Sequence, residues 1–210
     1  LRHYVGNGGR NVVKRICFAA MTVLVMLSAC GEAGQKESPA EDALEQYRNM
    51  TGAELAAHVS CTWNGEAREY LLDCTYVPDG ESTVEVQEPE ELAGLTAVVD
   101  GETMGLRYEG DCLDAGTISN EGISPAACLP RLLDALRTGW LLEENEEKWG
   151  EMDCLRLTVD TTGAEGGKIL WTVWLNRETG VPVHGEIAVE EEIIFELEFT
   201  EFSFCDTITR

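Results

Sequence analysis

The chain has few basic residues, few histidines and no long apolar run, and each shortage removes a class of function. It contains 15 Lys and Arg residues against 39 Asp and Glu residues, which gives a formal net charge of −24. A chain this acidic repels phosphate backbones, so nucleic acid is excluded as a partner. The apolar run at residues 16–27 is too short for a permanent transmembrane helix, which needs roughly 20 apolar residues.

Sequence motifs for catalysis are also missing. The chain has no Gly-x-Ser-x-Gly, no phosphate-binding loop and no Cys-x-x-Cys. His58 and His184 lie far apart in sequence and have no carboxylate or cysteine nearby at metal-ligand spacing. His58 falls opposite the apolar face of its expected strand, which is typical of a surface residue. We therefore expect no catalytic residues, no metal site and no cofactor.

Two acidic runs, residues 143–147 and 190–192, have the side chains that Ca²⁺ prefers. Neither run has the alternating oxygen ligands and the glycine of a built calcium loop. A calcium site and a solvated acidic face both remain open, and the pattern favours the solvated face.

The N-terminal segment has the order of a secretory signal peptide. Arg10, Lys14 and Arg15 precede the apolar run, and small residues follow it in Leu27-Ser28-Ala29-Cys30. These four residues resemble the lipobox of bacterial lipoproteins. The resemblance implies cleavage before Cys30 and a diacylglyceryl thioether on its sulfur, with acyl chains such as palmitate. An ordinary signal peptide and a buried helix are the alternatives.

This interpretation divides the chain into a signal peptide at 1–29, a lipidated N-terminus and tether at 30–38, and a single domain at 39–210. Four basic residues precede Cys30 and no acidic residue does, so cleavage would leave a net charge of −28. Anionic headgroups would repel this domain, and membrane binding would come from the acyl chains. We expect an extracytoplasmic protein anchored to the bacterial membrane by lipidated Cys30.

Within the domain, a first helix is expected from Pro39 to about residue 50, because Ser38 can cap it and Glu41 completes a capping box. A short helical turn is possible at residues 53–57. Ser124-Pro125 repeats the capping signal of Ser38-Pro39, and Leu129, Leu132, Leu133 and Leu136 form an apolar face that Gly139 closes. A proline inside a helix costs about 3 kcal/mol, so the continuous part of this second helix is expected to begin at Pro130. Residues 109–122 lack periodicity, and residues 140–149 read as an acidic connector.

Most other segments alternate apolar and polar residues, which is typical of strands with one buried face. Asn64-Gly65 predicts a two-residue hairpin turn, which places Cys61 opposite Arg68 and Cys74 opposite Leu55. Alternation slips by one residue near the C-terminus and predicts a β-bulge at Thr200-Glu201. The fold class is therefore α+β, with a curved antiparallel sheet and two or three helices covering its apolar face.

Six cysteines follow Cys30, and disulfides or buried thiols are both open for them. Their spacings do not match paired zinc ligands. The register expected around Asn64-Gly65 separates Cys61 from Cys74 by roughly 20 Å along the strands, which excludes a bond between them. Cys112 and Cys128 flank one loop and are the candidate disulfide.

One turn sequence resembles a known family. Residues 174–183, Trp-Leu-Asn-Arg-Glu-Thr-Gly-Val-Pro-Val, followed by Glu186, are similar to the strand-turn-strand signature of the outer-membrane lipoprotein carrier (Lol-type) proteins. Asp100-Gly101 resembles a hairpin of the same family. The resemblance covers residues 40–205 and implies an incomplete barrel of about eleven antiparallel strands, with helices as a lid over an apolar cavity.

The resemblance also implies functions that require no catalysis. Family members bind acyl chains of lipoproteins or sense envelope stress, and a clostridial germination lipoprotein partners a cortex-processing amidase. The function favoured here is a lipid-anchored, non-enzymatic envelope protein whose cavity binds an acyl chain or another apolar ligand. Its wall would be formed by the apolar strand residues Trp63, Tyr70, Trp171, Val173, Phe195, Leu197 and Phe199. The alternative is a filled core in a structural or regulatory partner of an envelope or spore-cortex enzyme.

Overall fold

The computed structural model describes residues 38–63, 66–117, 123–161 and 169–205. These residues belong to one compact unit, Ser38–Arg210. The expected signal peptide, Cys30 and the tether through residue 37 lie outside the described residues. Within the described ranges, no helix combines the length and the apolar character needed to cross a membrane.

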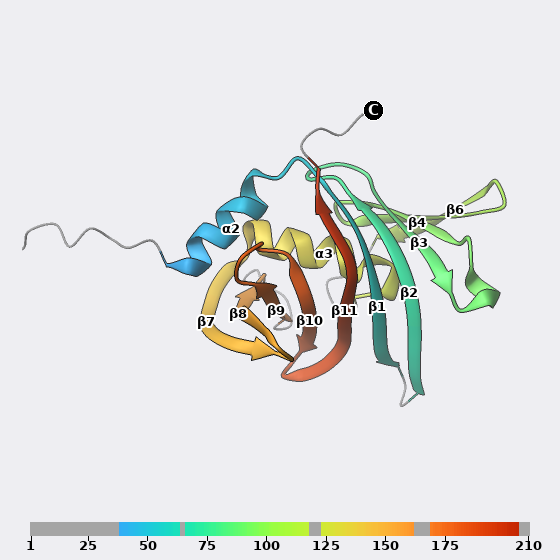
Figure 1. The fold of residues 1–210 in the computed structure, drawn as a ribbon. Helices are drawn as coiled ribbons and strands as arrows, with labels where there is room; N and C mark the ends of the chain where they lie inside the picture. The colour runs from blue at the N-terminus through green and yellow to red at the C-terminus, as the bar shows by residue number, and fades with distance from the viewer. Residues whose placement is uncertain (1–37, 64–65, 118–122, 162–168, 206–210) are drawn as a thin grey trace, which may run out of the picture. The chain divides into compact units, whose positions relative to one another are not determined.

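The unit is a long, curved antiparallel sheet with helices on its concave side (Figure 1). Eleven strands follow the order β6-β5-β4-β3-β2-β1-β11-β10-β9-β8-β7, and the two ends of the sheet do not pair, so the barrel is incomplete. The elements in chain order are α2 Pro39–Asn49, β1 Ala53–Trp63, β2 Glu66–Tyr76, β3 Ser82–Glu88, the 3₁₀ turn η1 Glu90–Leu92, β4 Thr96–Asp100, β5 Thr103–Tyr108, β6 Asp111–Thr117, α3 Pro125–Thr138, β7 Trp140–Trp149, β8 Met152–Asp160, β9 Ile169–Asn176, β10 Pro182–Val189 and β11 Glu192–Phe204. This arrangement confirms the expected α+β half-barrel.

The position of α3 follows from the strand order. Strands β6 and β7 are the opposite edges of the sheet, and α3 lies between them in sequence. A connection between opposite edges of a curved sheet has to cross one of its faces. The helix contacts β3, β4 and β2 on one side and β8 on the other, and Figure 1 shows it inside the curve of the sheet.

Several local predictions are confirmed. Helix α2 begins at Pro39 with Ser38 as its cap, and the Ser38 Oγ accepts a hydrogen bond from the Glu41 N–H. Cys61 lies opposite Arg68 and Leu55 lies opposite Cys74, as the hairpin turn requires. In the pairing of β1 with β11, Ala56 faces Glu201 and Ala57 faces Phe199, so Thr200 is the extra residue of a bulge.

Three predictions at the strand level are wrong. Residues 53–57, expected as a possible helical turn, are the beginning of β1. Part of the segment without periodicity forms β6, and the acidic connector at 140–149 is strand β7. Both β6 and β7 are edge strands with solvent on one side, so their sequences do not show the alternation of a half-buried strand.

Helix α3 also begins earlier than expected. It runs from Pro125, and Pro130 lies inside it. Side chains from both halves of the helix are fully buried, including Cys128, Leu129, Leu132 and Leu136. Packing against the sheet therefore outweighs the cost of the proline, because burial of several apolar side chains contributes roughly 1.5–3 kcal/mol for each.

Candidate functional site

The concave face is filled by the protein's own helix. Four of the seven predicted wall residues are at most 3% exposed, namely Trp171, Val173, Phe195 and Leu197. They share one apolar cluster with the leucines of α3. A Cβ placed on Gly185 of β10 would lie 3.5 Å from Leu132 Cδ2, so this helix side chain touches the floor of the sheet. The predicted wall is therefore part of the core of the domain.

The other predicted wall residues are less enclosed. Tyr70 and Phe199 are half-buried and pack against the edge of the same cluster. The side chain of Trp63 lies outside the described residues. The structure thus brings six of the seven predicted residues to the concave side, and two of these keep part of their surface in contact with solvent.

A polar network fastens α3 to the sheet. The Tyr76 hydroxyl of β2 donates a hydrogen bond to Asp134 Oδ1 at 2.5 Å. Arg137 donates to the Tyr76 oxygen at 3.3 Å and to Asp79 Oδ2 at 2.9 Å. Burial raises the pKa of Asp134 against the opposing effect of the Tyr76 hydrogen bond. Because the network joins the helix to β2 and to the turn after it, withdrawal of α3 would break several hydrogen bonds at once.

The turn that carries the family resemblance positions α2. Asn176 Oδ1 accepts hydrogen bonds from the N–H groups of Glu178 and Thr179, and Gly180 has a φ of +69°. These features explain why an Asx side chain and a glycine occur at this spacing. The Gly180 carbonyl accepts a hydrogen bond of 2.7 Å from the Tyr47 hydroxyl of α2. The signature therefore has a structural role, which is to dock the first helix.

The convex face carries an aromatic cluster around His184. The imidazole stacks on Trp149 with ring centroids 3.9 Å apart, and the Trp174 ring lies 4.9 Å away. Trp174 donates its Nε1–H to Glu147, and the Arg156 guanidinium lies over its ring. The sequence did not reveal this cluster, because Trp149 belongs to the segment taken as a connector. The alternation that predicts β10 gives no indication that Trp149 stacks on His184.

His184 is buried and lies beside a carboxylate. The side chain is only 6% exposed, its Nδ1 has no hydrogen-bond partner among the described residues, and its Nε2 is 3.7 Å from Glu186 Oε1. Burial lowers the pKa of His184, while Glu186, Glu196 and Glu198 act in the opposite direction. The histidine is therefore mainly neutral in the folded protein near pH 7.

This arrangement predicts a pH-dependent stability. Between the ordinary pKa of histidine, about 6.5, and its lower value in the folded protein, the unfolded chain binds more protons. The free energy of unfolding should then fall as the pH drops below about 6.5, by at most about 1.4 kcal/mol per pH unit from this residue. Urea denaturation at several pH values between about 7.5 and 5.5 measures the slope. His184→Phe should flatten it, and the same substitution at exposed His58 should not; equal slopes in the two variants would contradict the prediction.

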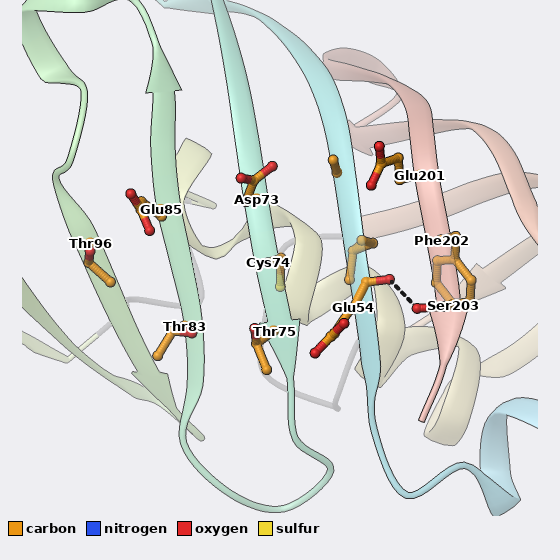
Figure 2. A pocket seen from close by; sticks show the side chains of 12 residues that line it. Glu54, Asp73, Cys74, Thr75, Thr83, Glu85, Thr96, Glu201, Phe202 and Ser203 are labelled. Atoms are coloured by element: carbon orange, nitrogen blue, oxygen red, sulfur yellow. Dashed lines mark hydrogen bonds between the residues drawn. The ribbon is translucent and has the colours of Figure 1, made fainter. Parts of the chain in front are cut away.

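Two hollows lie on the convex face. The larger, about 430 Å³, spans β11, β1, β2, β3 and β4, and Figure 2 shows the carboxylates Glu54, Asp73, Glu85 and Glu201 around it. The smaller, about 310 Å³, is lined by residues of β1, β2, β10 and β11, which are His58, Val59, Ser60, Glu69, Tyr70, His184, Glu196 and Glu198. Both hollows follow β1, so together they form a track along the outside of the sheet.

The cysteines divide by burial. Cys61, Cys74, Cys128 and Cys154 are free thiols and at most 7% exposed. Cys112, also a free thiol, is exposed on edge strand β6, whereas Cys128 is completely buried in α3. The structure therefore does not bring together the two members of the candidate disulfide.

Thiol reactivity tests this division. Burial raises the pKa of both Cys74 and Cys128, so neither forms the reactive thiolate in the folded protein. Titration of the native chain with a chromogenic disulfide should show a fast phase from Cys112, and Cys74 and Cys128 should react only after unfolding. Cys112→Ser should lower the amplitude of that phase by one thiol, because half-buried Cys205 and the cysteines outside the described residues also contribute to it, and Cys154→Ser should leave the amplitude unchanged. A Cys112–Cys128 bond would be revealed by equal amplitudes in the unaltered chain and in Cys112→Ser.

The described side chains form an apolar interior and an acidic outer surface. Among these residues, no group of three or more His, Cys, Asp or Glu side chains is placed to hold a metal ion. Apolar side chains pack together on the concave side, and many exposed carboxylates lie on the convex side. The apolar side is thus closed by α3, and the outer side is acidic and exposed.

The chain is similar to solved protein structures. No family model and no curated protein matches the chain. A putative outer-membrane lipoprotein-sorting protein domain from Vibrio parahaemolyticus is 12% identical, with coverage of 85% of this chain and 95% of that one and a TM-score of 0.46. A LolA superfamily protein from Nitrosomonas europaea is 11% identical, with coverage of 82% and 94% and a TM-score of 0.45.

A third solved structure contains a complex. One chain in the structure of the CwlD amidase from Clostridioides difficile in complex with the GerS lipoprotein is 15% identical, with coverage of 85% of this chain and 98% of that one and a TM-score of 0.36. The solved structures that this chain is similar to thus include the Lol-type group that its sequence resembles.

Proposed function

We propose that the chain is a non-enzymatic envelope lipoprotein that acts by binding a partner protein, with its half-barrel filled by its own helix. The observation that carries the proposal is the burial of Trp171, Val173 and Leu197 beneath α3. The leucine side chains of α3 fill the apolar interior, so an acyl chain has no room there unless the helix moves. The surface that remains for recognition is acidic.

Anchoring through Cys30 is part of this proposal. The full chain in a bacterial host should fractionate with membranes and carry the mass of a diacylglyceryl group. Cys30→Ser should abolish both properties, because acyl chains supply the membrane affinity of so acidic a protein. Intact-mass measurement and membrane fractionation provide the readouts, and membrane association of the Cys30→Ser variant without lipid would contradict the anchor.

Partner binding is tested by chemical cross-linking on membranes, followed by purification of the full chain and its covalent partners. The yield of one defined complex should fall when the membranes are equilibrated at about 500 mM salt instead of 50 mM, because salt screens attraction between exposed charges. The Cys30→Ser variant is the control for specificity at the membrane. A complex indifferent to salt, or none at all, would count against the proposal.

A second candidate is binding of an acyl chain, and the half-buried state of Tyr70 and Phe199 favours it. These side chains border the core and still reach solvent, so they mark the place where a ligand would enter if α3 moved. Native mass spectrometry of the full chain, with organic extraction of the same sample, tests this candidate. Extractable lipid that is lost in both Tyr70→Asp and Phe199→Asp, with the fold retained, supports it; a bare chain mass excludes it.

A further inference from the structure

Among the described residues, the ion pairs of the acidic surface lie away from the central strands. Ion pairs occur on α2, on α3, and on β7 to β9 with the turn that follows: Arg48–Glu41, Arg137–Asp79, Arg137–Asp134, Lys148–Asp153, Arg156–Glu143, Arg156–Glu147 and Arg177–Glu146. Strands β10, β11, β1, β2 and β3 contain a single Lys or Arg, which is Arg68, and it pairs with Glu66 at the end of the hairpin. Apart from Glu66, the carboxylates on the outside of these strands therefore have no basic counter-ion among the described residues.

Register arranges these carboxylates as the two walls of a trough whose floor is β1. Ser60 lies between Glu69 of β2 and Glu196 of β11, and this set is called the first rung. Ala56 lies between Asp73 of β2 and Glu201 of β11, and this set is the second rung. In each rung a small side chain separates two exposed carboxylates, so space for a cation lies between them.

Charges of the same sign face one another on this surface. Asp73 lies directly opposite Glu85, and Glu186 lies directly opposite Glu196. Like charges at such cross-strand positions destabilise a sheet. None of Asp73, Glu85 and Glu196 has an ion-pair partner among the described residues, and Glu186 has only neutral His184 nearby. The free trough is thus a surface of unrelieved repulsion, which a cationic occupant would remove.

His184 supplies an independent sign of a missing occupant. It lines the smaller hollow together with Ser60, Glu196 and Glu198. Its Nδ1 is buried without a hydrogen-bond partner in the described structure, although buried polar atoms are nearly always paired. In the strand register, Glu198 of β11 lies between His184 of β10 and His58 of β1. His184 therefore lies next to the first rung.

We propose that the trough binds an extended segment of a partner protein that carries Lys or Arg at positions i and i+4. This inference rests on the proposed function and names the surface and the partner chemistry. Ser60 and Ala56 are four residues apart on β1, which corresponds to roughly 14 Å at about 3.4 Å per residue. An extended segment lying along β1 has the same rise, so its residues i and i+4 meet the two rungs.

The dimensions favour a polypeptide. Strands two places apart are roughly 9.6 Å apart, so one ammonium or guanidinium group is within reach of both carboxylates of a rung. Two hollows of about 430 and 310 Å³ follow β1, and His58 lies between Ala56 of one and Ser60 of the other on that strand. A single small cation fills one rung, whereas a peptide chain occupies the whole track.

Fluorescence anisotropy with two synthetic peptides tests the proposal on the purified full chain. Both peptides have the same Lys, Thr and Val composition, and Lys occupies positions i and i+4 in one and i and i+3 in the other. The i,i+4 peptide should bind about tenfold more tightly, because only it reaches both rungs from one side of an extended chain. Affinity should fall with salt as the exposed charges are screened.

Matched variants locate the site. Glu69→Gln with Glu196→Gln removes the first rung, and Asp73→Asn with Glu201→Gln removes the second; each should weaken binding about tenfold. Glu90→Gln with Glu91→Gln removes the same charge from the exposed turn η1 and should change affinity less than twofold. If all three double variants weakened binding equally, the effect would depend only on net charge, and the proposal would be overturned.

A lysine variant and competition experiments decide the occupant. Ala56→Lys places an ammonium group inside the second rung and should block the peptide while raising the thermal midpoint of unfolding. Spermine that competes at the same concentration as the peptide, or equal binding of the two peptides, would overturn the extended-segment occupant. Failure of both peptides alongside an intact salt-sensitive membrane complex would refute the trough and leave the proposed function standing.

Discussion

Replacing Trp171 with aspartate is expected to unfold the protein. Trp171 is 3% exposed, lies on β9 under α3, and donates its Nε1–H to Thr161 Oγ1 at 2.9 Å. The substitution removes a large apolar side chain and buries a carboxylate without a partner, which together cost more than about 4 kcal/mol. That loss approaches the whole stability of a typical domain, about 5–15 kcal/mol. Urea denaturation followed by circular dichroism measures it.

Trp140→Asp is the matched control, because it makes the same chemical change at a tryptophan that is 81% exposed on β7. Its effect should remain within about 0.5 kcal/mol. A Trp171→Asp protein that stays folded and loses extractable lipid would show that this wall faces a ligand cavity. The filled-core reading would then be wrong, and the acyl-binding candidate would replace it.

Gly139→Ala should have the second largest effect, although the backbone there suits any residue. Gly139 has a φ of −71° and joins α3 directly to β7. Its N–H donates to the Ala135 carbonyl at 2.8 Å, and an added Cβ would lie 2.5 Å from that oxygen and 3.3 Å from the Asp160 oxygen. Both neighbours are backbone atoms, so the helix end has to move away from the sheet. We expect a loss of about 2–3 kcal/mol in thermal or urea unfolding.

Gly105→Ala on β5 is the control for this prediction. A Cβ there would lie 3.7 Å from the Leu113 oxygen, which is an ordinary contact. The substitution should change stability by less than about 1 kcal/mol. Similar losses at both glycines would mean that the close approach at the end of α3 does not determine the cost.

Both predictions concern the same architectural fact, which is that α3 occupies the concave side. With the apolar interior used for folding, the convex side is the surface left for recognition. The carboxylates there lack the arginines and lysine that neutralise acidic side chains elsewhere on the domain. The proposed partner binding and the proposed trough both follow from this division between the two faces.

Local signals in the sequence were sufficient for elements whose geometry is set by neighbouring residues. Ser38 and Pro39 predicted the start of α2, because a cap and a first-turn proline act within one helical turn. Asn64-Gly65 predicted the register of β1 with β2, since a two-residue turn fixes every pair that follows. The slip in alternation predicted the bulge at Thr200 for the same reason.

Elements with little local signal were missed. Strand β7 reads as an acidic connector because it has solvent along its free edge, and its pairing partner β8 supplies the ladder that makes it a strand. The beginning of α3 was misplaced because Pro130 disfavours a helix locally, while burial of Cys128 and Leu129 against the sheet favours one. The stack of His184 on Trp149 joins residues 35 positions apart and depends on both elements being placed.

The sequence by itself determined the class of fold, the hairpin register, the acidic character of the surface and the absence of known catalytic motifs, because composition and short-range spacing specify them. Only the tertiary structure decided that the predicted wall residues form a core, that Cys112 and Cys128 lie in different environments, and that unpaired carboxylates line β1 on both sides. These properties depend on which strands become neighbours. Strand order places β1 beside β11, across more than 130 residues of chain, and carries α3 over the concave face.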